Sequence, residues 1–146
     1  GLVKPNHGIG HDESSRTQDE CRDLIRSHHT GLLAQMAAKL RAVPEGDGNM
    51  LDNTMIIYFS DAANKHHADC FEWPYLVVGG CGGRLSLPGR YIRYPKYGDE
   101  GCRTIGNWWT SLLNGFGNPL EHYGNEDLVL KQNGVSYRGP LSELIV

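Results

Sequence analysis

The sequence predicts an α/β fold with a mostly parallel sheet, and three features support this. Residues 55–59 and 75–78 form two short apolar runs rich in β-branched and aromatic side chains, each bounded by turn-forming residues. Unbroken runs of this kind are typical of strands buried on both faces. A long amphipathic stretch precedes the first run, and a second helix-like stretch follows the other. We therefore expect two buried strands covered by helices.

The first helix is expected to begin after Thr17 and to end before Pro44. Thr17 and Glu20 match a capping box, which marks a helix start, and proline cannot continue a helix. Between them, apolar positions recur every three or four residues, which is typical of a helix with one buried face. The stripe comprises Cys21, Leu24, Ile25, His28, Leu32, Met36 and Leu40. We expect His28 to lie in the core and His29 in solvent.

The C-terminal part is predicted to contain a second helix and two short strands. Residues 103–114 read as the helix, with Trp108 and Trp109 as core anchors. Residues 128–131 and 135–137 are expected to be strands joined by an Asn-Gly turn.

Composition excludes several classes of protein. The chain of 146 residues suits one modest domain, or a portion of one, and its net charge of −3 gives no reason to expect nucleic acid. No apolar run approaches the ~20 residues that span a bilayer, and no signal peptide is recognised. The first residue is glycine, as expected of a processed product or fragment. The sequence does not decide whether two of Cys21, Cys81 and Cys102 form a disulfide. A Cys70–Cys81 pair is disfavoured, because a predicted strand separates the two residues.

A cluster of polar residues follows the first predicted strand. In open α/β sheets, ligands bind beyond the carboxyl ends of the strands, where Asp61 and the next histidines are expected. Imidazole and carboxylate are the usual ligands of zinc, which could activate water or hold a phosphate or sulfate ester. The candidate ligands are His7, His11, Asp61, His66 and His67, with Asp69 and Cys70 as outliers. The alternative is a solvated polar surface. Calcium near residues 45–52 is disfavoured because the EF-hand spacing is absent.

Longer motifs extend across the chain. They include L-D-N-T-M-I-I-Y-F-S-D, the His66-His67 pair, P-Y-L-V-V-G-G, G-R-Y-I-R-Y-P and G-N-W-W-T-S-L-L. Together they resemble an exported bacterial family, abundant in planctomycetes, of the alkaline phosphatase-like and sulfatase-like superfamily. The resemblance covers nearly the whole chain, but only about the C-terminal third of a family member. It implies an incomplete three-layer α/β/α domain and a periplasmic or cell-surface location.

The resemblance also implies a ligand pattern, from which this chain departs. His7 occupies a position that is acidic in the superfamily, His11 matches a second ligand, and His66 or His67 matches a third. Asp61 matches the aspartate of a second metal site, but Ala62 replaces its histidine. The superfamily's nucleophile belongs to an N-terminal half outside this chain, so the catalytic residues are unknown.

Two functional hypotheses follow. The chain is either the C-terminal segment of an exported metal-dependent ester hydrolase or a degenerate, non-catalytic structural or complex subunit. Catalysis by these residues alone, through a Cys70–His67 pair, is the third choice. Two strands cannot complete a doubly wound sheet, so their edges would be exposed. We therefore expect the chain to pack against a missing N-terminal part or another protein chain.

Overall fold

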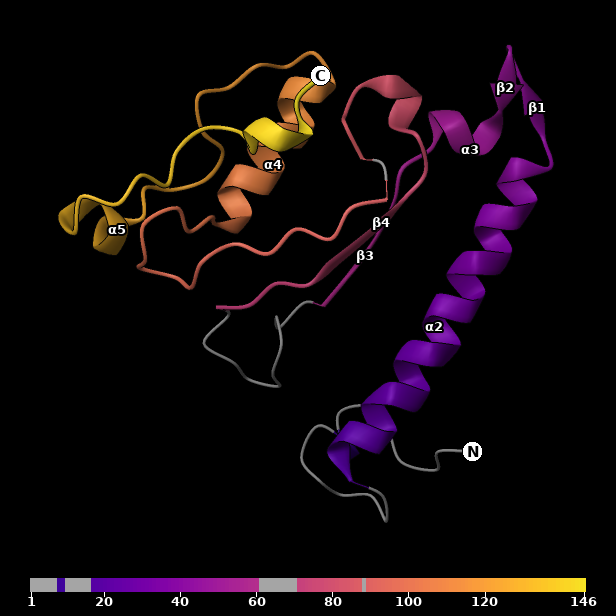
Figure 1. The fold of residues 1–146 in the computed structure, drawn as a ribbon, viewed down its shortest axis with the longest axis horizontal. Coiled ribbons are helices and arrows are strands. Elements are labelled where there is room, and N and C mark those ends of the chain that lie inside the picture. Colours follow the sequence, from indigo (N-terminus) through magenta and orange to yellow (C-terminus); the bar gives the residue numbers. More distant parts are fainter. Residues whose placement is uncertain (1–7, 10–16, 61–70, 88) are drawn as a thin grey trace.

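The computed structural model describes residues 8–9, 17–60, 71–87 and 89–146. Figure 1 shows the named elements of these ranges, which form helices and two small antiparallel sheets. In chain order they are α2 (Gln18–Arg41), β1 (Pro44–Glu45), β2 (Gly48–Asn49), α3 (Met50–Asn53), β3 (Ile56–Phe59), β4 (Tyr75–Val78), α4 (Ile105–Gly115) and α5 (Leu128–Gln132). Two single-turn 3₁₀ helices, Cys81–Gly83 and Ser142–Leu144, complete the description. None of the described helices has the length and apolarity that crossing a membrane requires.

Helix α2 forms where the sequence predicts it. The Thr17 hydroxyl accepts a hydrogen bond from the Glu20 backbone N–H at 3.3 Å, and the Glu20 carboxylate accepts one from the Thr17 N–H at 3.0 Å. This reciprocal capping box satisfies backbone donors that the first turn otherwise leaves unpaired. Lys39 and Arg41 in the last turn complement the negative end of the helix dipole.

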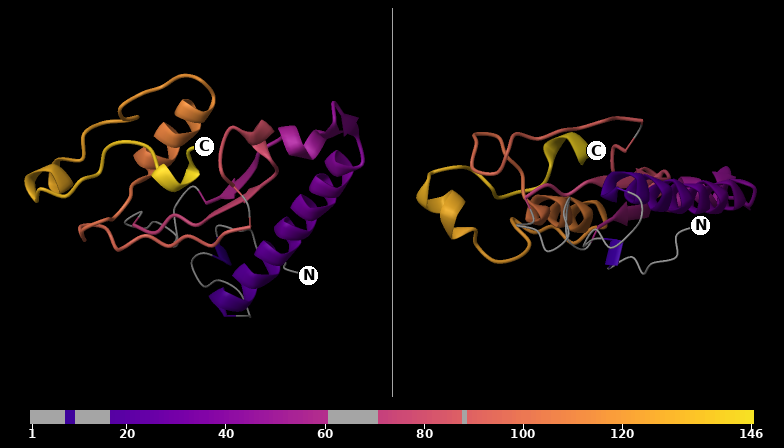
Figure 2. Two further views of the ribbon diagram at one scale, coloured as in Figure 1. Left: turned by 45° about the horizontal axis from the view of Figure 1, so that its top comes forward. Right: turned by 90° about the horizontal axis from the view of Figure 1, so that it is seen from below.

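The predicted burial of the α2 stripe is wrong for much of its length. Leu24, Leu32 and Met36 retain 45%, 50% and 43% of their surface, and His28 is also exposed. Figures 1 and 2 show α2 along one side of the molecule, away from α4 and α5. Periodicity shows that a helix has an apolar face, but something must cover that face to bury it.

A double glycine joins the end of β4 to α3. The Gly80 N–H donates to the Leu51 carbonyl at 3.0 Å, and the Cys81 N–H donates to the Thr54 carbonyl at 3.1 Å. A Cβ at Gly79 or Gly80 would clash with backbone carbonyl oxygens of residues 52–54, and Gly79 has a φ of +110°. Glycine is needed here for both close approach and backbone conformation.

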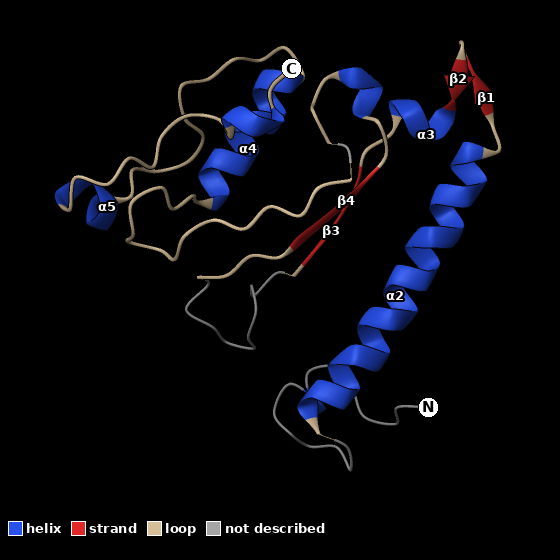
Figure 3. Cartoon of the chain, in the orientation of Figure 1, coloured by secondary structure: helices blue, strands red, loops and turns tan. Residues whose placement is uncertain are grey.

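The two predicted strands exist, but their arrangement corrects the predicted fold class. β3 pairs with β4 in antiparallel register, with Ile56 opposite Val78 and Phe59 opposite Tyr75. Figure 3 shows strands only in this pair and in the small β1–β2 pair. The described residues therefore do not form the mostly parallel sheet of an alkaline phosphatase-like three-layer α/β/α domain. An apolar run reports burial on both faces of a strand and carries no information on its direction.

The main core lies between the β3–β4 pair and α4. Trp108 is buried at its centre, as predicted, and its ring centroid lies 4.8 Å from that of Tyr75. Trp109 is only partly buried and packs at the edge. The buried members of this cluster are Cys81, Leu85, Trp108, Leu112, Leu141 and Leu144. The core thus joins the last residues of the chain to its middle.

The predicted strand over residues 128–131 is wrong, because the chain forms helix α5 there. The Asp127 carboxylate caps this helix by accepting a hydrogen bond from the Leu130 N–H at 3.0 Å. Asn133 is its C-cap, and Gly134 follows with a φ of +69°. The Asn-Gly pair therefore ends a helix instead of joining two strands.

The cysteines in the described residues do not form the disulfide that the sequence left open. Cys21, Cys81 and Cys102 are all buried thiols. Cys102 packs with Leu130 and Tyr137 in a second, smaller core beneath α5. Cys81 and Cys102 act as small apolar groups in the two core clusters. Cys70 lies outside the described residues.

Candidate functional site

The predicted metal ligands cannot be placed from the described structure. All five, His7, His11, Asp61, His66 and His67, lie outside the described residues, as do Asp69 and Cys70. Within the described ranges, no group of three or more His, Cys, Asp or Glu side chains could hold a metal ion. The antiparallel pairing also removes the reason to expect a crevice at a shared carboxyl edge, because β3 and β4 end at opposite ends of the pair.

Two described histidines lie on α2, and neither belongs to the predicted ligand set. His28 was expected in the core but is exposed. His29 is exposed as predicted, and its Nδ1 lies 3.1 Å from the Tyr58 hydroxyl of β3. The ring centroids of His28 and His29 are 6.1 Å apart, and the two ring planes are tilted by 51°. His29 thus links α2 to the β3–β4 pair through a polar contact.

The most polar part of the interior lies on α4. Asn107 is 1% exposed, and its Nδ2 donates hydrogen bonds to the carbonyls of Tyr137 and Gly139, both at 2.8 Å. Its Oδ1 accepts from the Thr104 N–H at 2.7 Å and from the Thr104 hydroxyl at 3.1 Å. The side chain uses all four of its hydrogen-bonding positions on protein partners. We identify it as an architectural residue.

The two buried hydroxyls of α4 are also fully engaged. Thr110 Oγ1 donates to the Gly106 carbonyl at 2.6 Å and accepts from the Tyr123 N–H at 2.9 Å. Ser111 Oγ donates to the Asn107 carbonyl at 2.8 Å and accepts from the Leu141 N–H at 2.7 Å. Neither residue is exposed to solvent. A hydroxyl held in this way is not available as a nucleophile, so α4 supplies attachment points for later segments.

His122 packs on the first turn of α4. A Cβ at Gly106 would lie 2.8 Å from His122 Cε1, and the imidazole meets the Tyr137 ring edge-on at 5.5 Å. Its Nδ1 is buried with no hydrogen-bond partner among the described residues. Burial lowers the pKa of His122, Arg138 lowers it further, and Glu121 acts in the opposite direction. These surroundings therefore favour the neutral form of the imidazole.

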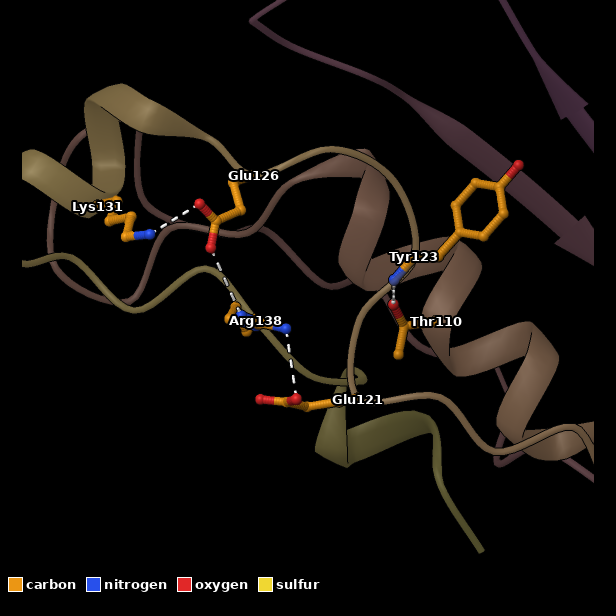
Figure 4. Close-up of polar contacts among 6 residues, drawn as sticks. All are labelled: Thr110, Glu121, Tyr123, Glu126, Lys131 and Arg138. Carbon is orange, nitrogen blue, oxygen red and sulfur yellow. Dashed lines mark hydrogen bonds and ion pairs between the residues drawn. The ribbon is translucent and has the colours of Figure 1, made fainter.

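A chain of surface ion pairs links Glu121, Arg138, Glu126 and Lys131, as Figure 4 shows. Arg138 lies 3.3 Å from Glu121 and 3.8 Å from Glu126, and Glu126 lies 2.7 Å from Lys131. The hydrogen bond from Lys131 lowers the pKa of Glu126. An open depression of about 370 Å³ adjoins them, lined by Glu126, Lys131, Gly134, Val135, Ser136, Tyr137 and Arg138. Both cations already face carboxylates, so the depression offers no unpaired positive charge to an anion.

A third polar group ties the end of the chain to residues 86–94. The Tyr94 hydroxyl donates to the Glu143 carboxylate, and Arg90 donates to the Glu143 carbonyl at 2.7 Å and to the Ser86 carbonyl at 2.6 Å. Burial and this carboxylate raise the pKa of Tyr94. Burial acts to raise the pKa of Glu143 as well, but the hydrogen bond from Tyr94 and the charge of Arg103 bring it below its usual value. The group is structural, because the contacts of Tyr94 and Arg90 with Glu143 hold the 3₁₀ turn at Ser142–Leu144 against residues 86–94.

Apolar surface is the described feature that the fold leaves without a partner. Leu24, Leu32 and Met36 form a ridge on α2, because residues four apart share a helix face. On the β3–β4 pair, Phe59 and Leu76 are 42% and 41% exposed. The sequence pattern located these residues correctly on one stripe and two strands, but it assigned them to the core. Nothing in periodicity distinguishes a core face from a docking face.

Comparison of the chain with protein-family models, with curated proteins and with solved structures finds no match.

We expect Asn107→Ala to lower the free energy of unfolding by about 3 kcal/mol, because it leaves buried backbone groups without partners. Asn107→Asp should be at least as damaging, since it sets a carboxylate against the carbonyls of Tyr137 and Gly139. Urea denaturation would measure both, with the exposed Asn125→Ala as the matched control, expected within about 0.5 kcal/mol of wild type. Equal effects of Asn107→Ala and Asn125→Ala would contradict the architectural role.

We expect His122 to make stability depend on pH on the acidic side. The unfolded chain binds a proton near pH 6.5, whereas the folded chain binds it only at a lower pH. The free energy of unfolding should therefore fall as pH drops through 6.5 and level off below the folded pKa. Denaturation curves measured between pH 8 and pH 5 would give the free energy of unfolding at each pH. Its dependence on pH should be weaker in His122→Gln than in the wild type. A slope unchanged by this substitution would contradict the assignment.

Proposed function

We propose that this chain is a non-catalytic structural component that assembles with another polypeptide surface. The exposed ridge of α2 is the observation that carries the proposal. Leu24, Leu32 and Met36 each keep more than two fifths of their surface in solvent, on one face of a helix. Contiguous patches of large apolar side chains on a protein surface often mark interaction sites, whereas single exposed apolar residues do not.

The β3–β4 pair adds a second reason. Its residues are apolar or aromatic at every position, which suits a sheet covered on both faces. One face packs against the α4 core through Ile57, Tyr75 and Val77. No third strand pairs with β3 or β4 among the described residues. A strand edge without a neighbouring strand is a site where another chain can pair. A two-stranded sheet gains stability when it is extended or covered.

The polar interior supports a structural role over a catalytic one. The buried amide and hydroxyls of α4 are occupied by hydrogen bonds within the protein. The surroundings of His122 on the first turn of that helix favour its neutral form, and the nearby cations are paired with carboxylates. These groups stabilise the chain's own irregular segments.

We expect Leu32→Lys to abolish assembly without unfolding the chain. The substitution puts a charge on the ridge at a half-exposed position, so the free energy of unfolding should stay within about 0.5 kcal/mol of wild type. The wild-type protein isolated from its own cells should have a native mass above that of the monomer. The Leu32→Lys variant should have the mass of the monomer. Light scattering coupled to size-exclusion chromatography measures this.

Ala34→Lys is the matched control for this experiment. It adds the same charge to an exposed position of α2 two residues further on, and so on a different face. This variant should keep the assembled mass. A wild-type chain that runs as a monomer from its own cells would contradict the proposed function. A loss of several kcal/mol in Leu32→Lys would instead place Leu32 in a core.

A metal-dependent hydrolase of phosphate or sulfate esters is the second candidate, and one observation favours it. Phe59 and Tyr75 are opposite each other in the β3–β4 register, so the segment joining them leaves and returns at one end of the pair. That segment carries Asp61, His66 and His67. Zinc is the metal that such ligands would favour, and export to the periplasm or cell surface belongs to this candidate.

Metal content tests the second candidate. Under it, native protein should contain stoichiometric zinc, iron or manganese by elemental analysis, and the Asp61→Ala/His67→Ala double variant should lose it. His28→Ala removes a histidine outside the candidate set and should retain the metal. Native protein without metal, or a double variant that keeps its metal, would rule out these ligands.

A further inference from the structure

We propose that residues 120–123 form a latch on helix α4, and that this latch opens when the His122 imidazole gains a proton. The latch lies in the C-terminal half of the chain, so the inference is independent of the exposed face of α2. An open latch uncovers the first turn of α4 and the ring of Tyr137, which is otherwise buried.

Two hydrogen bonds hold the latch on α4. The Leu120 N–H donates to Asn114 Oδ1 at 2.7 Å, and the Tyr123 N–H donates to Thr110 Oγ1 at 2.9 Å, the second of which Figure 4 shows. Leu120 and Tyr123 keep 38% and 49% of their surface exposed, so they bury little apolar area. Residues 116–127 belong to no helix or strand of the described structure. Segments with few buried apolar contacts open at a low cost in free energy.

The His122 imidazole lies against α4 at a position where only glycine leaves room for it. A Cβ at Gly106 would lie 2.8 Å from His122 Cε1 and 3.1 Å from Nε2. On another side, the Tyr137 ring meets the imidazole edge-on, with centroids 5.5 Å apart. Tyr137 is itself fixed, because its carbonyl accepts a hydrogen bond from Asn107. The closed latch therefore depends on a close contact that the missing side chain of Gly106 allows.

A proton on the imidazole opposes this closed arrangement. His122 Nδ1 is buried and has no hydrogen-bond partner within the described part of the chain. Both ring nitrogens of a charged imidazole carry protons, so Nδ1 becomes a buried donor of a charged group. A charged donor without an acceptor costs more to bury than a neutral imidazole does. Release of the latch places this nitrogen in water.

The groups around His122 act in the same direction on balance. Burial is the largest effect and lowers the pKa of His122, and the Arg138 guanidinium lowers it further. Glu121 favours the proton, but its carboxylate also lies 3.3 Å from Arg138. The first two turns of α4 carry no ionisable side chain, and their end of the helix dipole is positive. The open latch restores the ordinary pKa of about 6.5, so the open population rises as the pH falls.

Hydrogen exchange of individual amides, followed by NMR, tests whether this opening is local. The Leu120 and Tyr123 amides report the latch. The buried Leu141 amide, which donates to Ser111 Oγ, reports opening of the main core. Between pH 8 and pH 5, protection of the two latch amides should fall about tenfold relative to that of Leu141, once intrinsic exchange rates are corrected for pH. Equal changes at all three amides, or no relative change, would overturn the proposal.

Two variants separate the proton from the contact. His122→Gln should remove the pH dependence of the relative protection, because the amide does not titrate. Gly106→Ala should lower latch protection at both pH values, because its Cβ displaces the imidazole, and should leave Leu141 protected. Gly31→Ala is the matched control, since a Cβ there meets nothing within 4 Å, and it should change neither reading. A pH dependence that persists in His122→Gln, or a protected latch in Gly106→Ala, would overturn the proposal.

Discussion

The buried side chain of Asn107 supports most of the architecture of the C-terminal half. This half contains little regular structure beyond α4 and α5, so most of its backbone groups have no helix or sheet partner. Buried backbone groups without partners are costly, and side chains on α4 supply those partners. Asn107 holds residues 137–139, while Thr110 and Ser111 hold residues 123 and 141. Three buried polar side chains on one helix thus organise the irregular chain around it.

The apolar contacts of α4 complete this arrangement. Trp108 and Leu112 share a core with Leu141 and Leu144, so the end of the chain lies against the helix that also binds it through hydrogen bonds. The β3–β4 pair closes the same core through Tyr75. Apolar burial supplies the larger part of the stabilisation, whereas the hydrogen bonds fix which segment lies where. The α4 helix is therefore packed against segments of its own half of the chain, whereas α2 has few such contacts among the described residues.

Helix α2 keeps much of its apolar face exposed. Its caps satisfy the backbone at the ends, yet most helical stability in proteins comes from packing of an apolar face. Only part of that face is covered, since Cys21 is fully buried whereas Leu24, Leu32 and Met36 stay exposed. The buried amide and hydroxyls of α4 are paired within the C-terminal half, although Trp108 Nε1 and His122 Nδ1 have no partner among the described residues. The long helix, in contrast, is open on one face. The buried polar groups stabilise the fold, whereas the apolar face of α2 stays exposed.

The sequence alone determined the local elements, and the tertiary structure decided what they do. The capping box at Thr17, the apolar runs of β3 and β4 and the tryptophan-bearing helix are all visible in the sequence, because caps and periodicity act over a few residues. At α5 the three consecutive apolar residues fit a strand as well as a helix, and the Asp127 cap was recognised only in the structure. The direction of β4 and the exposure of Leu32 were not visible. Strand direction depends on the path of the segment that joins the two strands. Burial of a side chain depends on which residues, distant in the sequence, pack against it. Neither of these is encoded in the spacing of neighbouring residues.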